Sequence, residues 1–119
     1  ISNLRIKAGS PFALANQLSG GNQQKVLLGR WLAGDTRILI LDEPTVGIDV
    51  GTKANIYMLL RKLARGGKAI LVVSSDMEEV LTIADRVVVM AQGKITGRFD
   101  KKNMSQDSIL RAASGEAVL

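Results

Sequence analysis

The clearest pattern of hydrophobic and polar positions lies over residues 38–45, where an apolar run is followed by two acids and a proline. A short continuous apolar run rich in β-branched residues predicts a strand that is covered on both faces, as in the middle of a parallel sheet. Pro44 has no N–H to donate and ends the ladder. Asp42 and Glu43 therefore fall at the carboxyl end of a buried strand, where open α/β sheets place their ligands.

An acidic pair at this position suits a hydrated magnesium ion and an attacking water. An ordinary strand that ends in a solvated acidic turn gives the same pattern. For the strand taken alone, the second interpretation is the better one.

The remaining periodicity predicts helices and strands in alternation. Apolar residues at helical spacing over 52–64 indicate an amphipathic helix, and residues 69–73 form a second apolar run typical of a buried strand. A strand, a helix and a strand in this order favour a parallel crossover, so the fold class is α/β. Before residue 38 we expect an edge strand over 4–8 and a helix over 23–33. After residue 73 we expect a helix whose apolar stripe contains Met77, Val80, Leu81 and Ala84, and then strands over 86–91 and 94–99 joined by a tight turn at Gln92 and Gly93. The last expected element is a short helix over 103–113 with Ile109, Leu110 and Ala113 inward.

Composition narrows the chemistry that the chain can support. The 119 residues contain no cysteine and no histidine. Disulfides and thiolate metal sites are therefore excluded, and any chemistry rests on carboxylates, hydroxyls, amides and cations. No apolar run approaches the roughly 18 residues of a membrane span, and no segment resembles a signal peptide. We expect a soluble chain.

The net charge of +5 raises the question of a nucleic-acid partner. The Lys and Arg residues are scattered through every segment, and one Trp, one Tyr and two Phe offer little surface on which bases could stack. The sequence favours a solvated basic surface with some attraction for anionic membrane or nucleotide. No nucleic-acid partner is expected.

A second informative stretch precedes the expected helix over 23–33. Ser19 is a candidate N-cap, and Gly20 and Gly21 allow a backbone to approach a ligand closely. The N–H groups of a helix N-terminus, together with a serine hydroxyl, form a site for an anion, most commonly phosphate. On Ser-Gly-Gly alone, a plain capped helix is the better interpretation.

Taken with their neighbours, the two stretches resemble ATP-binding cassette (ABC) ATPases. The resemblance covers roughly residues 6–99 and is greatest to the second nucleotide-binding half of the fused ATPase subunits of bacterial ribose- and galactose-type importers. The motifs that carry it are Leu-Ser-Gly-Gly-Asn-Gln-Gln-Lys from Leu18, Asp-Glu-Pro-Thr from Asp42, Gly-Ile-Asp-Val-Gly from Gly47, Ser74-Ser75-Asp76, and Asp85-Arg86 leading to Gln92-Gly93-Lys94. The implied fold is the C-terminal part of a P-loop NTPase core, and residues 1–119 are expected to be a partial nucleotide-binding domain.

The resemblance also implies roles for individual residues, in a reaction that depends on positioning and charge neutralisation. Asp42, in the Walker B segment, would hold Mg²⁺ through water, and Glu43 would polarise the attacking water as general base. Asp49 would be the D-loop acid that links two composite sites. The signature motif would contact the γ-phosphate of ATP held by the opposite nucleotide-binding domain, through Ser19, Gly20, Gly21, Asn22 and Gln23.

Two departures from the family pattern limit these roles. The sequence has no Gly-x-x-x-x-Gly-Lys-Ser/Thr loop, so it lacks the N–H nest and the lysine that hold the β and γ phosphates, and the family's glutamine loop would lie upstream of Ile1. The position of the switch histidine is Ser75, which cannot carry a positive charge and is equally well explained as an N-cap paired with Glu78. We expect the chain alone to bind ATP poorly and to hydrolyse it negligibly. We expect the site around Glu43 to be impaired even in the parent protein.

Three functional hypotheses follow. In the first, the chain is part of the ATP-hydrolysing subunit of a sugar importer, peripheral to the cytoplasmic side of the membrane. Its direct partners would be the opposite nucleotide-binding domain and a membrane permease, with a periplasmic sugar-binding protein as an indirect partner. In the second, it is a non-catalytic module that donates the signature motif. The third, less favoured, is an ABC ATPase of DNA repair or translation, which usually keeps a switch histidine.

The absence of the first half of such a domain has a structural consequence. The parallel sheet of the family interleaves strands from both halves, so apolar sheet edges and helix faces would be exposed in this chain. We therefore expect the fragment to self-associate.

Overall fold

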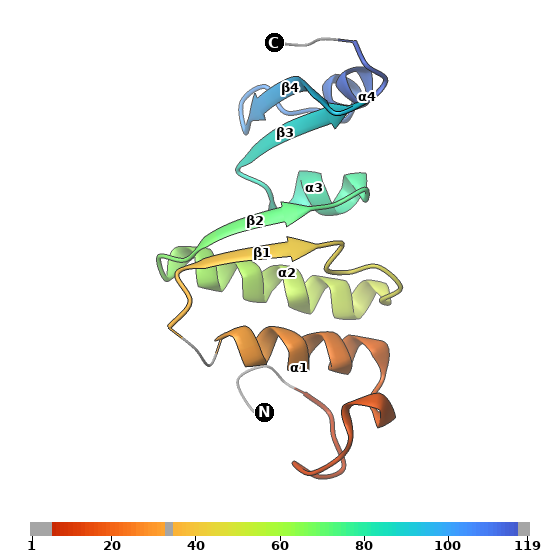
Figure 1. The fold of residues 1–119 in the computed structure, drawn as a ribbon, viewed down its shortest axis with the longest axis vertical. Helices are drawn as coiled ribbons and strands as arrows, with labels where there is room; N and C mark the ends of the chain where they lie inside the picture. Colours follow the sequence, from red (N-terminus) through yellow and green to blue (C-terminus); the bar gives the residue numbers. More distant parts are fainter. Residues whose placement is uncertain (1–5, 33–34, 117–119) are drawn as a thin grey trace. The chain divides into compact units, whose positions relative to one another are not determined.

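The computed structural model describes residues 6–32 and 35–116. The chain divides into two compact units, Ile1–Val73 and Ser74–Leu119, and each is described by itself. Figure 1 shows the order of the elements along the chain. Among the described helices, none is long and apolar enough to cross a membrane.

The first unit is a strand–helix–strand arrangement preceded by a further helix. Its elements are the 3₁₀ turn η2 (Ala15–Gln17), helix α1 (Gly20–Leu32), strand β1 (Ile38–Asp42), helix α2 (Val50–Arg65) and strand β2 (Ala69–Val73). The two strands pair in parallel, from Ile38 opposite Ala69 to Asp42 opposite Val73. α2 contacts the sheet and α1 contacts α2. The predicted α/β fold with parallel strands and flanking helices is confirmed.

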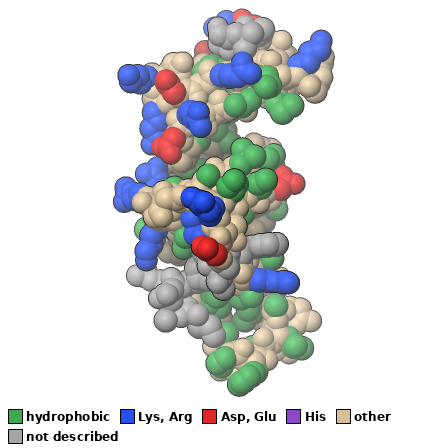
Figure 2. All heavy atoms as spheres, turned by 60° about the vertical axis from the view of Figure 1, so that its left-hand side comes forward, with side chains coloured by type: hydrophobic (Ala, Val, Ile, Leu, Met, Phe, Trp, Pro, Cys, Tyr) green, Lys and Arg blue, Asp and Glu red, His purple; other side chains and the backbone are tan. Residues whose placement is uncertain are grey.

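Within the part of the chain that the structure describes, the sheet of the first unit is covered on one face. Side chains alternate between the faces of a strand, and Leu39 is buried, as are Ile56 and Leu60 of α2. On the other face Ile40 is 70% exposed and Leu71 is 56% exposed, and Figure 2 shows hydrophobic side chains reaching the surface. The expectation of a strand covered on both faces is therefore wrong for this chain. The expected exposure of apolar sheet surface is confirmed, and the self-association that would follow from it stays a prediction.

The second unit is a β-hairpin with a helix packed on one face. It contains helix α3 (Met77–Ile83), strands β3 (Arg86–Ala91) and β4 (Lys94–Asp100), and helix α4 (Gln106–Ala113). The strands pair antiparallel. Gln92 and Gly93 have φ angles of 49° and 76°, because a two-residue hairpin turn needs positive φ to match the twist of the strands. The buried core consists of Val89, Phe99, Ile109 and Ala112.

The two ends of the chain differ in detail from the expectations. Residues 6–8 of the expected edge strand over 4–8 have no regular structure, and the rest of that strand lies outside the described residues. α4 begins at Gln106 because Ser105 caps it, accepting the N–H of Ser108 at 3.1 Å. The helix turns Ile109 and Ala112 inward and leaves Leu110 52% exposed, so the expected inward positions of Leu110 and Ala113 are wrong. Residues three apart share a face of a helix, whereas neighbours in sequence do not.

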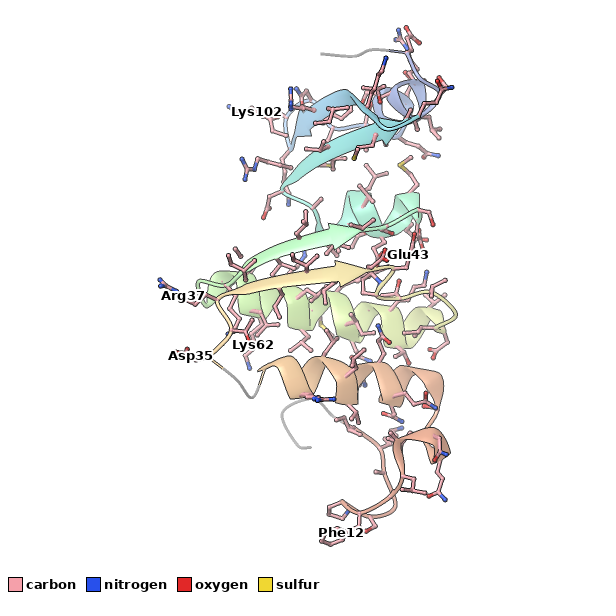
Figure 3. All side chains as sticks on the ribbon, viewed as in Figure 1. Phe12, Asp35, Arg37, Glu43, Lys62 and Lys102 are labelled. Atoms are coloured by element: carbon pink, nitrogen blue, oxygen red, sulfur yellow. The ribbon has the colours of Figure 1, made fainter. Side chains whose placement is uncertain are left out.

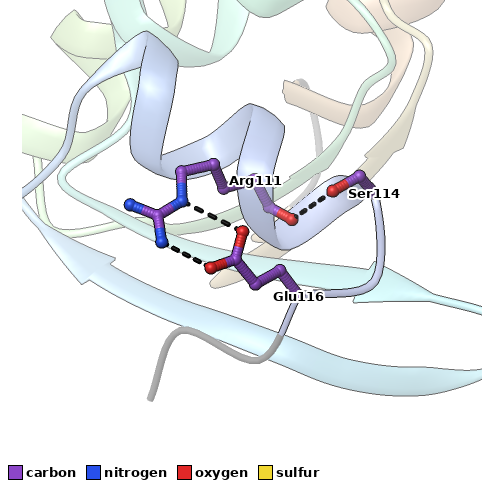
Figure 4. Close-up of polar contacts among 3 residues, drawn as sticks. All are labelled: Arg111, Ser114 and Glu116. Atoms are coloured by element: carbon purple, nitrogen blue, oxygen red, sulfur yellow. Dashed lines mark hydrogen bonds and ion pairs between the residues drawn. The ribbon is translucent and has the colours of Figure 1, made fainter.

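An ion pair joins the last turn of α4 to the residues that follow it. The Arg111 guanidinium donates from Nε to Glu116 Oε2 at 3.1 Å and from Nη2 to Oε1, while the Ser114 hydroxyl donates to the Arg111 carbonyl at 2.7 Å (Figure 4). These hydrogen bonds from Arg111 lower the pKa of Glu116. Both side chains are more than half exposed, so solvent screens the pair and it adds little to stability.

A close approach at Gly97 fixes how α4 sits on β4, and it gives a first prediction. A Cβ at this position would lie 2.7 Å from Cε2 of Phe99 and 2.9 Å from Cβ of Ala112. Gly97→Ala should therefore lower the free energy of unfolding by about 1–3 kcal/mol through overpacking of the core. Urea unfolding followed by circular dichroism measures the change.

Gly20→Ala is the control for this experiment, because nothing lies within 4 Å of a Cβ at Gly20. Its effect should stay within about 0.5 kcal/mol, as for other substitutions away from packed contacts. Equal losses for the two variants would show that the packing at Gly97 is not the cause.

Candidate functional site

One edge of the first unit gathers most of the residues singled out in the sequence. The carboxyl end of β1 and the N-termini of α1 and α2 all lie at this edge (Figure 1). Parallel pairing of β1 with β2 places the carboxyl ends of both strands there. Carboxylates and two helix N-termini thus share one end of the unit, the position at which open α/β sheets bind ligands.

Asp42 and Glu43 occupy different positions at the end of β1. Asp42 is the last paired residue, opposite Val73, and its side chain is exposed. The Glu43 N–H donates one further bond to the Val73 carbonyl at 2.8 Å, and the Glu43 carbonyl accepts the Val46 N–H at 3.2 Å. The side chain of Glu43 is half-buried at this end of the unit (Figure 3). The expected end of the ladder at Pro44 is confirmed.

Glu43 has a backbone conformation that is rare for a residue with a side chain. Its φ angle is 45°, in the left-handed region that costs energy for residues other than glycine. Pro44 and Thr45, which follow it, are buried. Strained residues of this kind persist where the surroundings hold them, and they cluster at functional sites.

Ser19 occupies the N-cap position of α1, as the sequence predicted. Its carbonyl accepts the Gln23 N–H at 2.9 Å, and its hydroxyl accepts Nδ2 of Asn22 at 3.0 Å. Ser19 and Gly20 are exposed. The first N–H groups of a helix lack intrahelical partners and carry partial positive charge, so this turn suits an anion.

The amide side chains of Asn22 and Gln23 brace the chain that leads into α1. Asn22 Oδ1 accepts the Lys7 N–H at 3.1 Å, and Gln23 Nε2 donates to the Leu18 carbonyl at 2.8 Å. Both amides bond to groups of this chain. Their expected contact with a phosphate stays a prediction.

Asp49 caps the N-terminus of α2. Its Oδ1 accepts the Thr52 N–H at 2.9 Å, and its carbonyl accepts the Lys53 N–H at 2.9 Å. Hydrogen bonds from the Thr52 side chain and backbone lower the pKa of Asp49 below its ordinary value of 3.8. The carboxylate therefore stays ionised at neutral pH. Its expected role between two composite sites stays a prediction.

A contact that sequence reasoning missed joins the N-termini of α1 and α2. A Cβ placed on Gly21 would lie 2.4 Å from Cγ2 of Thr52, so only glycine fits here without a shift of the Thr52 side chain. Thr52 thus touches Gly21 and also bonds to Asp49. Thr52 lies outside the recognised motifs, and only the packing of the two helices shows its position.

Ser75 belongs to the second unit and does not have the capping role considered for it. The N-cap of α3 is Asp76, whose Oδ1 accepts the N–H groups of Glu78 and Glu79 at 3.0 and 3.2 Å. The Ser74 hydroxyl accepts the Asp76 N–H at 3.0 Å. The expected capping box of Ser75 and Glu78 is therefore wrong, because the helix begins one residue later and a carboxylate takes the capping position.

The donor set at the edge of the first unit is compatible with a hydrated cation and a phosphate. Among the described residues, no group of three or more His, Cys, Asp or Glu side chains is placed to enclose a metal ion. Asp42 and Glu43 supply oxygen donors of the kind that Mg²⁺ uses while it keeps most of its waters. Binding of Mg²⁺ through water on Asp42 stays a prediction.

Comparisons with known proteins agree with this arrangement. A family profile described as ABC transporter matches residues 2–46. The galactose/methyl galactoside import ATP-binding protein MglA of Escherichia coli (strain K12) is 50% identical over 114 residues, 96% of this chain and 22% of that protein. The ribose import ATP-binding protein RbsA of Geobacillus kaustophilus (strain HTA426) is 51% identical over 112 residues, 94% of this chain and 23% of that protein. The chain spans less than a quarter of the length of these curated relatives.

Solved structures show the same fold. The dimeric structure of a post-hydrolysis state of an ATP-binding cassette bound to ADP and Pi matches with a TM-score of 0.73 and 30% identity, over 83% of this chain and 43% of that one. The ADP conformation of another ATP-binding cassette of an ABC transporter matches with a TM-score of 0.68 and 26% identity, over 82% of this chain and 37% of that one.

The cap at Asp49 gives a prediction about pH. Because folding lowers its pKa below 3.8, Asp49 stabilises the fold at pH values above 3.8, and this stabilisation is lost as the pH falls through the folded pKa. Asp49→Ala should lower the thermal unfolding midpoint at neutral pH, and its deficit relative to the wild type should shrink in acid. Asp49→Asn keeps a capping oxygen and serves as the control. A deficit for Asp49→Ala that does not change with pH would contradict this account.

The contact between Gly21 and Thr52 gives a third prediction. Gly21→Ala should destabilise the first unit by about 1–3 kcal/mol, because the added methyl meets the Thr52 side chain. Thr52→Ser removes Cγ2 and keeps the hydroxyl, so the double variant should recover about 1 kcal/mol relative to the sum of the single changes. Urea unfolding of all four proteins completes the cycle. Strict additivity would rule out the contact.

Proposed function

The chain belongs to the ABC transporter ATPases, and we propose that it is the part of a sugar-import ATPase that carries the signature motif and Walker B. The observation that carries the proposal is the edge of the first unit, where the acids that end β1 share one end with the N-termini of α1 and α2. The edge offers carboxylate oxygens for a hydrated cation and helix N–H groups for a phosphate. Phosphoryl transfer depends on both.

In this proposal the signature turn acts on ATP held by an opposite nucleotide-binding domain. The first N–H groups of α1 and the Ser19 hydroxyl donate to the γ-phosphate, and the exposure of Ser19 and Gly20 leaves room for a ligand to approach. Gly21 keeps the turn next to α2. Asn22 and Gln23 complete the turn, and their bonds to the chain before α1 support a rigid donor geometry.

The acids of β1 serve a second site, on this domain. Asp42 would hold a water of the Mg²⁺ shell, and Glu43 would accept a proton from the attacking water. When bound, Mg-ATP supplies the phosphoryl group and a cation that neutralises its charge. Glu43 is half-buried and conformationally fixed by its bond to Val73, as a positioned base requires. Asp49 connects the two sites.

The two sites are proposed to be unequal. Ser75 stands at the position of the switch histidine, and a hydroxyl cannot bring positive charge to a γ-phosphate. The site that contains Glu43 is therefore the weak one, while Ser19 to Gln23 complete the competent site of the opposite domain.

The names of the relatives suggest the biological setting. MglA and RbsA are import ATP-binding proteins for galactose/methyl galactoside and for ribose. We infer that the parent of this chain drives uptake of a monosaccharide, at the cytoplasmic face of the membrane, with a permease as partner and a periplasmic binding protein as an indirect one. ATP with Mg²⁺ is its cofactor.

A second candidate function is favoured by one sequence feature. No Gly-x-x-x-x-Gly-Lys-Ser/Thr loop occurs in the 119 residues, so the chain by itself has no nest for the β and γ phosphates. A module that donates the signature turn without hydrolysing ATP of its own needs no such loop. In that case Ser19 would be essential to the assembly and Glu43 would be dispensable.

The proposal predicts different consequences for changes at its two sites. In the intact protein that contains this segment, Ser19→Ala should lower the ATPase rate about 100-fold, as expected for loss of a donor to developing charge on phosphate. Glu43→Gln should have a much smaller effect, because it lies in the weak site. Steady-state phosphate release measures both rates.

Ser10→Ala is the matched control, because it removes an exposed hydroxyl outside the signature stretch. Its rate should equal that of the wild type. An unchanged rate for Ser19→Ala would overturn the signature role. Equal losses for Ser19→Ala and Glu43→Gln would overturn the unequal division between the sites.

A further inference from the structure

The charged side chains of α2 are all of one sign. The helix carries the cations Lys53, Arg61, Lys62 and Arg65 and no acid. The imbalance continues along the chain, because no Asp or Glu occurs between Asp49 and Asp76 although acids make up 11 of the 119 residues. Solvated helix faces usually interleave both signs of charge. The missing acids indicate a surface that faces a negatively charged partner.

Arg61, Lys62 and Arg65 lie near the C-terminus of α2, at the end of the first unit that is opposite Asp42 and Glu43. We define the basic edge as the five residues that lie where α2 ends and the two strands begin. Figure 3 shows Arg37 and Lys62 at this end and Glu43 at the other, and Figure 2 shows Lys and Arg side chains on the surface. The basic edge consists of Arg37, Arg61, Lys62, Arg65 and Lys68.

Backbone bonds hold the basic edge rigid. The Gly66 and Lys68 N–H groups donate to the Lys62 and Leu63 carbonyls at 3.0 and 3.1 Å, and the Ala69 N–H donates to the Arg37 carbonyl at 2.9 Å. The Lys68 ammonium also donates to the Thr36 carbonyl. Four of the five side chains are exposed, and that of Lys68 is half-buried. The backbone that carries these cations is therefore ordered, and their charged groups are presented to solvent.

Stabilisation of α2 through its dipole does not explain all five cations of the basic edge. Cations in the last turn stabilise a helix through its dipole, which accounts for Lys62 and Arg65. Arg37 and Lys68 lie outside the helix, and they add charge of the same sign at the same place. Asp35 is an acid at this end (Figure 3), and by itself it does not balance five cations.

The surroundings of the edge favour a lipid surface over nucleic acid. Met58 is 60% exposed and lies one turn before Arg61 and Lys62, on the same face of α2. An apolar side chain beside cations suits the boundary between headgroups and acyl chains. Single-stranded nucleic acid would use exposed aromatic rings for stacking, and Tyr57, the aromatic residue of α2, is half-buried.

We propose that the basic edge binds the anionic headgroups of a phospholipid membrane. This interaction adds a membrane contact of the ATPase segment itself to the contact with a permease in the proposed function. It needs neither nucleotide nor permease, so it is tested on this chain alone, and its failure would leave the proposed function untouched.

The test is sedimentation of the chain with vesicles of phosphatidylcholine, with and without phosphatidylglycerol. The wild type should bind the anionic vesicles and dissociate from them when salt is added. It should bind the neutral vesicles much less. The triple change Arg61→Gln, Lys62→Gln and Arg65→Gln should lower partitioning onto anionic vesicles about 100-fold, given the usual contribution of each cation near such a surface. Glutamine keeps the helix propensity of the replaced residues, and circular dichroism checks the fold.

The matched control removes the same charge from the second unit, through Lys94→Gln, Arg98→Gln and Lys102→Gln, all of which are exposed. It should retain most of the binding. Equal losses for the two triple variants would mean that net charge alone acts, and this would overturn the proposal. Wild-type binding that is equal on neutral and anionic vesicles, or tighter binding to a DNA oligonucleotide, would overturn it as well.

Discussion

The structure of the first unit depends on the parallel pairing of β1 and β2. This ladder brings the carboxyl ends of both strands to one edge and extends one bond further, from the Glu43 N–H to the Val73 carbonyl. That last bond, with the burial of Pro44 and Thr45 behind it, holds Glu43 at positive φ. Two strands form only a marginal sheet by themselves, so the strained turn relies on α2, whose buried Ile56 and Leu60 belong to the same unit.

The same ladder leaves apolar surface open. Ile38 and Ile40 of β1 and Leu71 of β2 are each more than half exposed, which is unusual for strands of this composition because parallel sheets are normally covered on both faces. The short length relative to the relatives gives a physical reason. Both strands are apolar on both faces, as is typical of strands inside a larger sheet. The described residues provide a helix for one face. Sequence and local fold are consistent, and the packing is incomplete.

Patterns of spacing predicted the elements well, because helical and strand periodicities are local properties. The parallel pair, the hairpin turn at Gln92 and Gly93, and the N-cap position of Ser19 all followed from residue order. Burial was predicted less well, since exposure of Ile40 and Leu110 depends on which other elements are present. Thr52 could not be found from sequence, because its contact with Gly21 joins helices about thirty positions apart. The N-cap of α3 is Asp76 and not the expected Ser75. The difference is one residue, which is the usual uncertainty in predicting where a helix begins.

α2 relates the two ends of the first unit to a single rule of topology. A helix between two parallel strands must run antiparallel to them, so its N-terminus comes to the carboxyl edge and its C-terminus to the opposite edge. The helix dipole then favours an acid at the first end and cations at the second, and Asp49, Lys62 and Arg65 follow that preference. Stability explains these three residues without any ligand. Stability does not require the left-handed backbone of Glu43 at one end, nor does it require Arg37 and Lys68, which come just before β1 and β2 at the other end. These features are the ones that point to function.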